Sequence, residues 1–143
     1  MPGPSSTRAG AAARACNALP DPVATGDIVV VDGPVPAGIG GDIVDGTYVF
    51  TGGSYYGGAA GAPAGTVLVT LGSTVVLNAG SYDEISLIQG QTDTSSGTIS
   101  FVDTTAASTS TCPDVASGSG DYTFDGATLT LYGPDSAETY ALQ

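Results

Sequence analysis

The chain has 143 residues, of which 41% are apolar and only 11% are charged, and this size fits one domain with a modest core. From Ala15 to Gln143 it contains no Lys, Arg or His, so this stretch offers no imidazole, amine or guanidinium for acid–base catalysis, Schiff-base chemistry or anion binding. All 14 acidic residues follow Arg14, and we therefore expect nucleic acids and anionic lipid surfaces to repel the domain.

Residues 1–15 are rich in Pro, Gly, Ser and Ala and lack the continuous apolar run of a signal peptide. We expect a disordered linker, or the remnant of an export segment that starts upstream, because Ala13-Arg14-Ala15 has the small-x-small pattern of a cleavage site. No later stretch approaches the ~18 apolar residues of a membrane-spanning helix. Residues 16–143 are then expected to form a single β-barrel-like domain.

The first half of this domain predicts strands and no helices, since Gly interrupts every candidate helical window. Runs of β-branched and aromatic residues predict strands at 27–31 and 47–51, the second continuing through Tyr55 and Tyr56 after a Gly52-Gly53 bulge. Residues 57–65 are expected to form a loop. A hairpin is expected next, with strands at 66–71 and 74–77.

The second half continues the same pattern. We expect strands at 82–89 and 98–102, the latter with Ile99 and Phe101 facing inward, and then a Ser/Thr-rich loop that leads to Cys112. Asp125-Gly126 predicts a hairpin between 119–124 and 128–132, and residues 138–142 close the chain as a last strand. Eight or nine antiparallel strands fit an all-β fold, either a small barrel or a β-sandwich.

The two cysteines, Cys16 and Cys112, have no His to activate a thiolate and too few companion ligands to hold zinc. We interpret them as a disulfide, which suits the extracytoplasmic character of the composition.

Several short motifs resemble one group of bacterial proteins. They are S-G-D-Y-T-F-D-G-A-T-L-T-L-Y at 119–132 with a later E-T-Y, C-N-A-L at 16–19, I-V-D-G-T-Y at 43–48 and T-C-P at 111–113. Together they are similar to uncharacterised exported proteins and lipoproteins of myxobacteria that carry lipocalin-like domains. The resemblance implies a Cys16–Cys112 bridge and a location in the periplasm, the outer envelope or the extracellular space. It implies no activity and no catalytic residues.

Carboxylates are the main acid–base groups left. Adjacent Asp83 and Glu84 point to opposite faces of a strand, and no other pair suggests a catalytic site. Acid clusters also bind calcium, and the candidate ligands are Asp42, Asp45, Asp121 and Asp125. Asp-Gly at 45–46 and 125–126 is, however, ordinary turn chemistry. We therefore expect no cofactor, with Ca²⁺ as the alternative.

The aromatic residues Tyr48, Phe50, Tyr122 and Phe124 are candidates for binding a ligand, although the same side chains fill the interior of many small barrels. Three functions remain open. We expect a non-enzymatic, monomeric domain with a structural or interaction role in the cell envelope, where an envelope protein is the partner. The alternative is a lipocalin-like binding module for a small apolar or amphipathic ligand. An enzyme that works with carboxylates alone would need two acids facing one pocket with separated pKa values.

Overall fold

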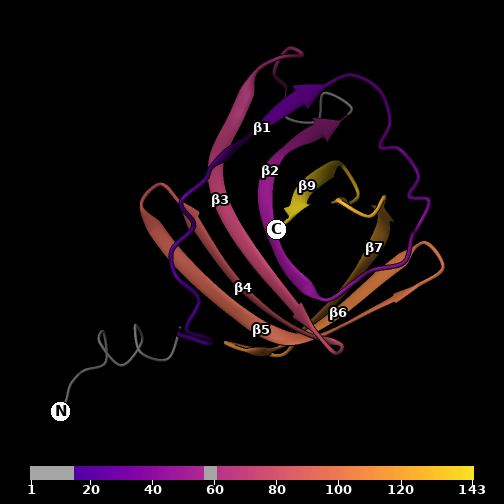
Figure 1. The fold of residues 1–143 in the computed structure, drawn as a ribbon. Helices are drawn as coiled ribbons and strands as arrows, with labels where there is room; N and C mark the ends of the chain where they lie inside the picture. The colour runs from indigo at the N-terminus through magenta and orange to yellow at the C-terminus, as the bar shows by residue number, and fades with distance from the viewer. Residues whose placement is uncertain (1–14, 57–60) are drawn as a thin grey trace.

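Nine strands form a closed β-barrel in the computed structural model, which describes residues 15–56 and 61–143 (Figure 1). The strands are β1 Gly26–Val31, β2 Gly46–Tyr56, β3 Val67–Asn78, β4 Ser81–Ile88, β5 Gln91–Val102, β6 Thr105–Cys112, β7 Ala116–Phe124, β8 Thr128–Tyr132 and β9 Ser136–Leu142. The all-β class and the small barrel are confirmed. The expectations for residues 1–14 and for the start of the 57–65 loop lie outside the described residues, which contain no helix able to cross a membrane.

The barrel closes because β2 to β9 form an antiparallel meander and β9 pairs with β2. β1 is the exception to this order. It lies parallel to β2, with Ile28 opposite Gly53, and antiparallel to β3, with Gly26 opposite Leu71 (Figure 1). The expectation of antiparallel strands alone is therefore wrong for β1, which fills the place where β2 and β3 separate.

The predicted hairpin around Gly72-Ser73 is also wrong, because both residues lie inside the continuous strand β3. Gly72 serves close packing rather than a turn. A Cβ atom at this position would lie 2.8 Å from the main-chain oxygen of Ala24 and 2.9 Å from Cβ of Pro22. A glycine in a strand often marks such a close approach of backbone, which a sequence pattern cannot separate from a turn.

The Ser/Thr-rich stretch before Cys112 forms a strand, β6, where we expected a loop, and β5 begins seven residues earlier than predicted. Thr is β-branched and suits a pleated strand, and Ala106 gives β6 one buried position. β5 and β6 approach closely at Gly97, where a Cβ would collide with the main-chain oxygen of Thr109. The pairing register shifts at this point, between Ser96 and Gly97.

Aromatic side chains from β2, β7 and β9 form the core of the barrel. Tyr48 packs edge-to-face against Phe124 with ring centroids 6.0 Å apart, and Phe50 packs in the same way against Tyr140 at 5.7 Å. These rings of β2, β7 and β9 therefore fill the interior, as such side chains do in many small barrels. Phe101 of β5 adds a third such pair by packing against Tyr122 at 4.9 Å, which confirms its predicted inward face.

The predicted 125–126 turn between β7 and β8 is present. Oδ1 of Asp125 accepts hydrogen bonds from the main-chain N–H groups of Ala127 (2.9 Å) and Thr128 (2.8 Å). These bonds favour the carboxylate and lower the pKa of Asp125 below its usual value. Gly126 has φ +100°, a conformation that side chains rarely adopt, so the choice of Gly here follows from the backbone.

Candidate functional site

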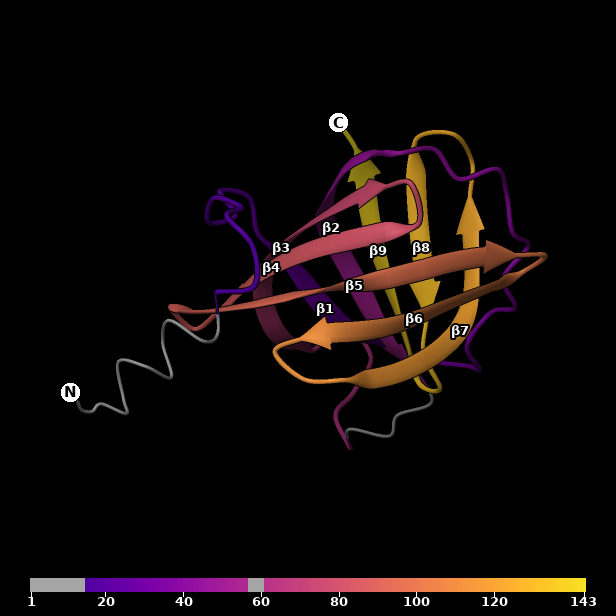
Figure 2. The same cartoon turned by 90° about the horizontal axis from the view of Figure 1, so that it is seen from below.

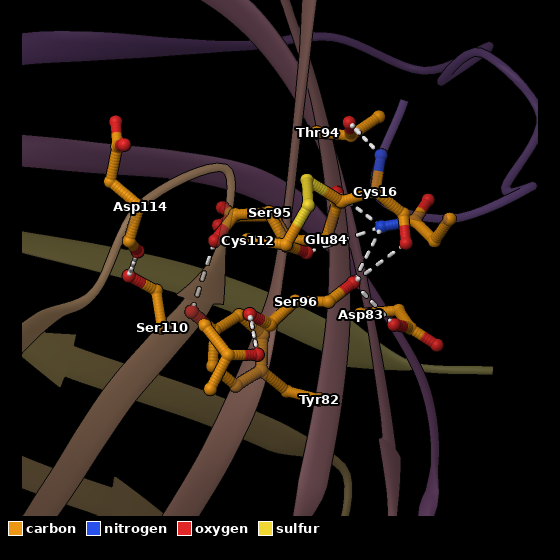
Figure 3. Close-up of a disulfide and its surroundings, with 12 residues drawn as sticks. Cys16, Tyr82, Asp83, Glu84, Thr94, Ser95, Ser96, Ser110, Cys112 and Asp114 are labelled. Carbon is orange, nitrogen blue, oxygen red and sulfur yellow. Dashed lines mark hydrogen bonds between the residues drawn. A yellow bond between two sulfur atoms is a disulfide. The ribbon is translucent and has the colours of Figure 1, made fainter. Parts of the chain in front are cut away.

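A disulfide joins Cys16 to Cys112 across 96 positions of the sequence, as predicted (Figure 3). It fastens residues 15–25, which we call the outer strap, to the end of β6. Such bonds persist in oxidising compartments, which is compatible with export. The main-chain N–H of Cys16 donates to Oγ1 of Thr94 (2.8 Å), and Thr94 stands opposite Ile85 in the β4–β5 pair. The strap therefore crosses the outer face of these two strands.

Asn17 makes the central polar contacts of the outer strap. Its Nδ2 donates to the main-chain oxygens of Glu84 and Ser95, both at 3.1 Å, which are partners in the β4–β5 pair. Ile85, which stands opposite Thr94, lies on the outer face of β4 and is nevertheless only 4% exposed. Both faces of β4 are thus covered, the outer one beside the strap and the inner one in the barrel interior.

A cavity of about 190 Å³, the inner cavity, lies inside the barrel beside the aromatic core. Its apolar wall is formed by Val75 of β3, Ile99 of β5 and Leu131 of β8, and two aromatic rings, Tyr82 of β4 and Tyr140 of β9, complete that wall. The volume equals about six waters at ~30 Å³ each, and it is smaller than the ~300 Å³ or more of pockets that hold drug-sized molecules.

The polar wall of the inner cavity holds two carboxylates, Glu84 of β4 and Glu138 of β9, together with Ser108 of β6. Oε1 of Glu138 accepts a hydrogen bond from the Tyr140 hydroxyl at 2.9 Å. Oε2 of Glu84 accepts one from Oγ of Ser73 at 3.4 Å, and Ser73 is the buried polar residue of the barrel at 2% exposed. Two acids from strands far apart in the sequence thus face one cavity.

The surroundings of these groups change their acidity. Burial raises the pKa of Glu84, the nearby charge of Glu138 raises it further, and the hydrogen bond from Ser73 opposes both effects. Burial likewise raises the pKa of the Tyr140 phenol well above its usual value, and the charges of Glu138 and Glu84 add to the effect. The cavity therefore disfavours additional negative charge.

A second void of about 160 Å³, the slot, adjoins the inner cavity. β7 is curved, with its first part beside β6 and only residues 122–124 paired with β8 (Figure 2). The slot lies along the remaining part, between Gly118 of β7 and Tyr132 of β8. It shares Ile99, Ser108 and Leu131 with the inner cavity.

The slot opens outward into a larger surface depression of about 490 Å³, the outer groove, which includes residues 35–37 and 133–134. Four residues line both the slot and the groove: Ser119, Gly120, Asp121 and Tyr132. Shared lining residues thus place the slot between the outer groove and the inner cavity that holds the two glutamates.

No family model, no curated protein and no solved structure matches this chain. The geometry of the barrel is therefore the basis for assigning a role to it.

The four predicted ligand-binding aromatics, Tyr48, Phe50, Tyr122 and Phe124, come together, but in the core rather than on the wall of the inner cavity. The hydroxyl of Tyr48 donates to the main-chain oxygen of Val44 (2.6 Å), and that of Tyr122 donates to the oxygen of Gly41 (2.8 Å). Both phenols thereby hold the 32–45 connection against the barrel. Ligand binding by these four residues stays a prediction.

The four predicted calcium ligands bond main-chain N–H groups or lie in solvent. Asp45 accepts from the N–H of Ala79, Asp121 accepts from that of Gly38, Asp125 caps its own turn, and Asp42 is exposed. Among residues 15–56 and 61–143, no three acidic or Cys side chains gather in a way that could hold a metal ion.

The sequence interpretation missed the pairing of Glu84 with Glu138. It placed Asp83 and Glu84 on opposite faces correctly, since Asp83 bonds Oγ of Ser96 beside the strap while Glu84 lines the cavity. A signal was present, because each glutamate stands two positions from a tyrosine, Tyr82 in β4 and Tyr140 in β9. Residues two apart share a face of a strand, so an inward tyrosine also places its glutamate inward.

Proposed function

We propose that this protein is an exported β-barrel binding module that holds a small amphipathic ligand in its inner cavity. The observation that carries the proposal is the void inside the barrel with an apolar wall, a polar wall and the slot beside it. Small-molecule sites commonly combine such apolar walls with a few converging polar groups. The disulfide and the resemblance to exported myxobacterial lipoproteins support a location outside the cytoplasm.

The competing interpretation is the envelope domain without a small ligand, which acts through protein contacts. We place it second because such a role gives no reason for acidic and hydroxyl groups to line an internal void, where polar groups cost free energy unless they have partners. A ligand that binds these groups supplies a reason.

A carboxylate-only enzyme is the third candidate, because Glu84 and Glu138 line one cavity and burial raises the pKa of Glu84. We rank it lower than binding. Glycoside hydrolysis needs room for a sugar ring and its leaving group between the two acids, and the inner cavity measures about 190 Å³. Release of a fluorescent aglycone that stops in both Glu84→Gln and Glu138→Gln would favour the enzyme.

The test of the binding function is a native mass spectrum of the protein exported by a bacterial host. We expect an additional mass that leaves on denaturation, and a peak two mass units below the reduced chain if the disulfide is intact. Ser108→Leu fills the inner cavity and should abolish the added mass. The control is Ser100→Leu on exposed Ser100 of the neighbouring strand β5, which should keep it. A bare peak for all three proteins would favour the envelope domain.

A further inference from the structure

We propose that the inner cavity binds a small organic cation, an amine attached to an apolar body, and that Glu84 and Glu138 act as its counter-ions. This inference rests on the proposed binding function and names the chemistry of the ligand. It starts from the composition of the cavity wall, which carries two acids and has no positive group opposite them in the described residues.

Charge balance is the first argument. A carboxylate removed from water is costly unless it is paired, and the usual partner in proteins is Lys, Arg or His. This chain has none of these residues from Ala15 onward, so no side chain of the described barrel can neutralise Glu84 or Glu138. A positively charged ligand would supply the missing partner, whereas an anionic ligand would add to the repulsion.

The other residues of the cavity wall indicate what kind of molecule would carry the positive charge. Val75, Ile99 and Leu131 offer an apolar surface to a hydrocarbon body. The rings of Tyr82 and Tyr140 line the same space, and an ammonium group near the face of a tyrosine ring gains a cation–π attraction. Tyr140 donates to one oxygen of Glu138, which fixes the carboxylate beside the ring. The cavity therefore suits a compact amine with an apolar or aromatic body.

An inorganic divalent cation fits less well. Ca²⁺ requires six to eight oxygen ligands, and Mg²⁺ requires near-octahedral coordination. The described residues bring together no group of three acidic or Cys side chains that could hold a metal ion. The apolar wall also offers no oxygen ligand to a metal ion. Calcium is therefore kept as a competing outcome of the test.

The electrostatic field of the molecule favours the same class of ligand. From Cys16 onward the chain has 14 acidic residues and no basic ones, so cations are concentrated around it. Asp121 lines both the outer groove and the slot, so a cation that passes inward meets carboxylate oxygen before it reaches the glutamates. The route thus has a carboxylate at its outer part, Asp121, and two at the inner cavity, Glu84 and Glu138.

The experiment uses three probes with the same aromatic body: benzylamine, which is protonated at pH 7, neutral benzyl alcohol, and anionic benzoate. Titration calorimetry with the disulfide-bonded protein should show binding of benzylamine that is about tenfold or more tighter than that of benzyl alcohol, which is the scale of one charge-assisted contact. Benzoate should not bind.

Variants then locate the site. Glu84→Gln and Glu138→Gln should each weaken benzylamine binding by about tenfold while leaving benzyl alcohol unchanged. The matched control is Asp83→Asn, which removes the same charge from β4 at the position facing Ser96 and should keep benzylamine binding within about twofold. Loss of benzylamine binding in Asp83→Asn as well would show that overall charge, and not the cavity, attracts the amine, and would overturn the inference.

Two further outcomes overturn the ligand class. Equal binding of benzylamine and benzyl alcohol would mean a neutral ligand, and Ca²⁺ binding that disappears in Glu84→Gln while benzylamine never binds would mean a metal site. In the first case the binding function survives, because Ser108→Leu still abolishes binding. Failure of every probe, together with a bare native mass spectrum, would reject the cation and the binding function alike.

Discussion

The side-chain amide of Asn17 donates to the main-chain oxygen of Glu84 at 3.1 Å, so the outer strap holds the strand whose inward side chain lines the inner cavity. The strap lies outside the barrel and the cavity inside, with a single layer of sheet between them. A change in the strap therefore reaches the cavity wall through the backbone of β4 and of β5, whose Ser95 oxygen accepts from the same amide.

Replacement of Asn17 by Ala should lower the free energy of unfolding by about 1–3 kcal/mol, because two main-chain oxygens lose a donor in a partly buried place. Urea unfolding followed by tyrosine fluorescence would measure it. Asn78→Ala, at the exposed end of β3, is the control and should stay within about 0.5 kcal/mol of the parent protein. Equal stability of the two variants would contradict the role assigned to Asn17.

Removal of the disulfide should be more costly. Cys16→Ser with Cys112→Ser opens a loop of 96 positions, and the loss of such a closure is expected to cost about 2–5 kcal/mol. Thermal unfolding of the double variant and of the reduced parent protein should give the same melting temperature. A reduced protein as stable as the oxidised one would show that the strap stays in place without its covalent bond.

Phe124→Ala should destabilise the barrel by about 3–5 kcal/mol, since the ring is 7% exposed and packs edge-to-face against Tyr48. Calorimetric melting provides the measurement. Val102→Ala, at a side chain that is 64% exposed, serves as the control and should leave the melting temperature nearly unchanged. An unaffected Phe124→Ala protein would place the ring outside the core.

The pH dependence of stability should change in Glu84→Gln. The pKa of Glu84 is raised in the folded state by burial and by the charge of Glu138, so its ionisation penalises the folded protein at pH above that raised pKa. The penalty fades as the pH falls toward 4.5, the ordinary pKa that the Glu84 carboxyl has in the unfolded chain. We therefore expect Glu84→Gln to melt at a higher temperature than the parent protein near neutral pH, with the difference shrinking on acidification.

Melting curves of both proteins across this range would check the sign. A constant difference at every pH would mean that Glu84 keeps an ordinary pKa in the folded barrel. The other titratable groups that line the inner cavity, Tyr82, Glu138 and Tyr140, remain unchanged in the comparison.

Gly118→Leu should slow ligand association. Gly118 lines the slot, and a Cβ atom there would meet nothing within 4 Å, so the larger side chain is tolerated and fills the passage. Stopped-flow measurement with benzylamine should show slower association and slower dissociation, with the affinity less affected than either rate. The control is Ser100→Leu on the exposed outer face of β5, which should leave both rates unchanged. Unchanged rates in Gly118→Leu would exclude the slot as the route.

Local patterns predicted the barrel well where strand signals were strong. The inward faces of Tyr48 and Phe124 follow from alternation, and the 125–126 turn follows from Asp-Gly chemistry. The pattern failed at Gly72, where a distant residue, Pro22, determines the need for a glycine. It also failed for the parallel pairing of β1, because strand direction depends on the path of the chain between strands rather than on their residues.

The candidate site was harder to predict for the same reason. Glu84 and Glu138 meet because the β2–β9 pairing closes the barrel, which is a property of the whole sheet. Alternation with Tyr82 and Tyr140 could have placed each glutamate on the inward face of its strand. Only closure of the barrel brings the two to one cavity.

The bond between Cys16 and Cys112 has a further consequence for the intact molecule. A protease that cuts the backbone once, at any site between these two residues, leaves both fragments attached to each other. The nicked protein would migrate as one species on a denaturing gel without reductant and as two with it. Outside the cytoplasm, where hydrolysing enzymes are common, such a barrel can suffer a broken loop and still remain a single covalent molecule.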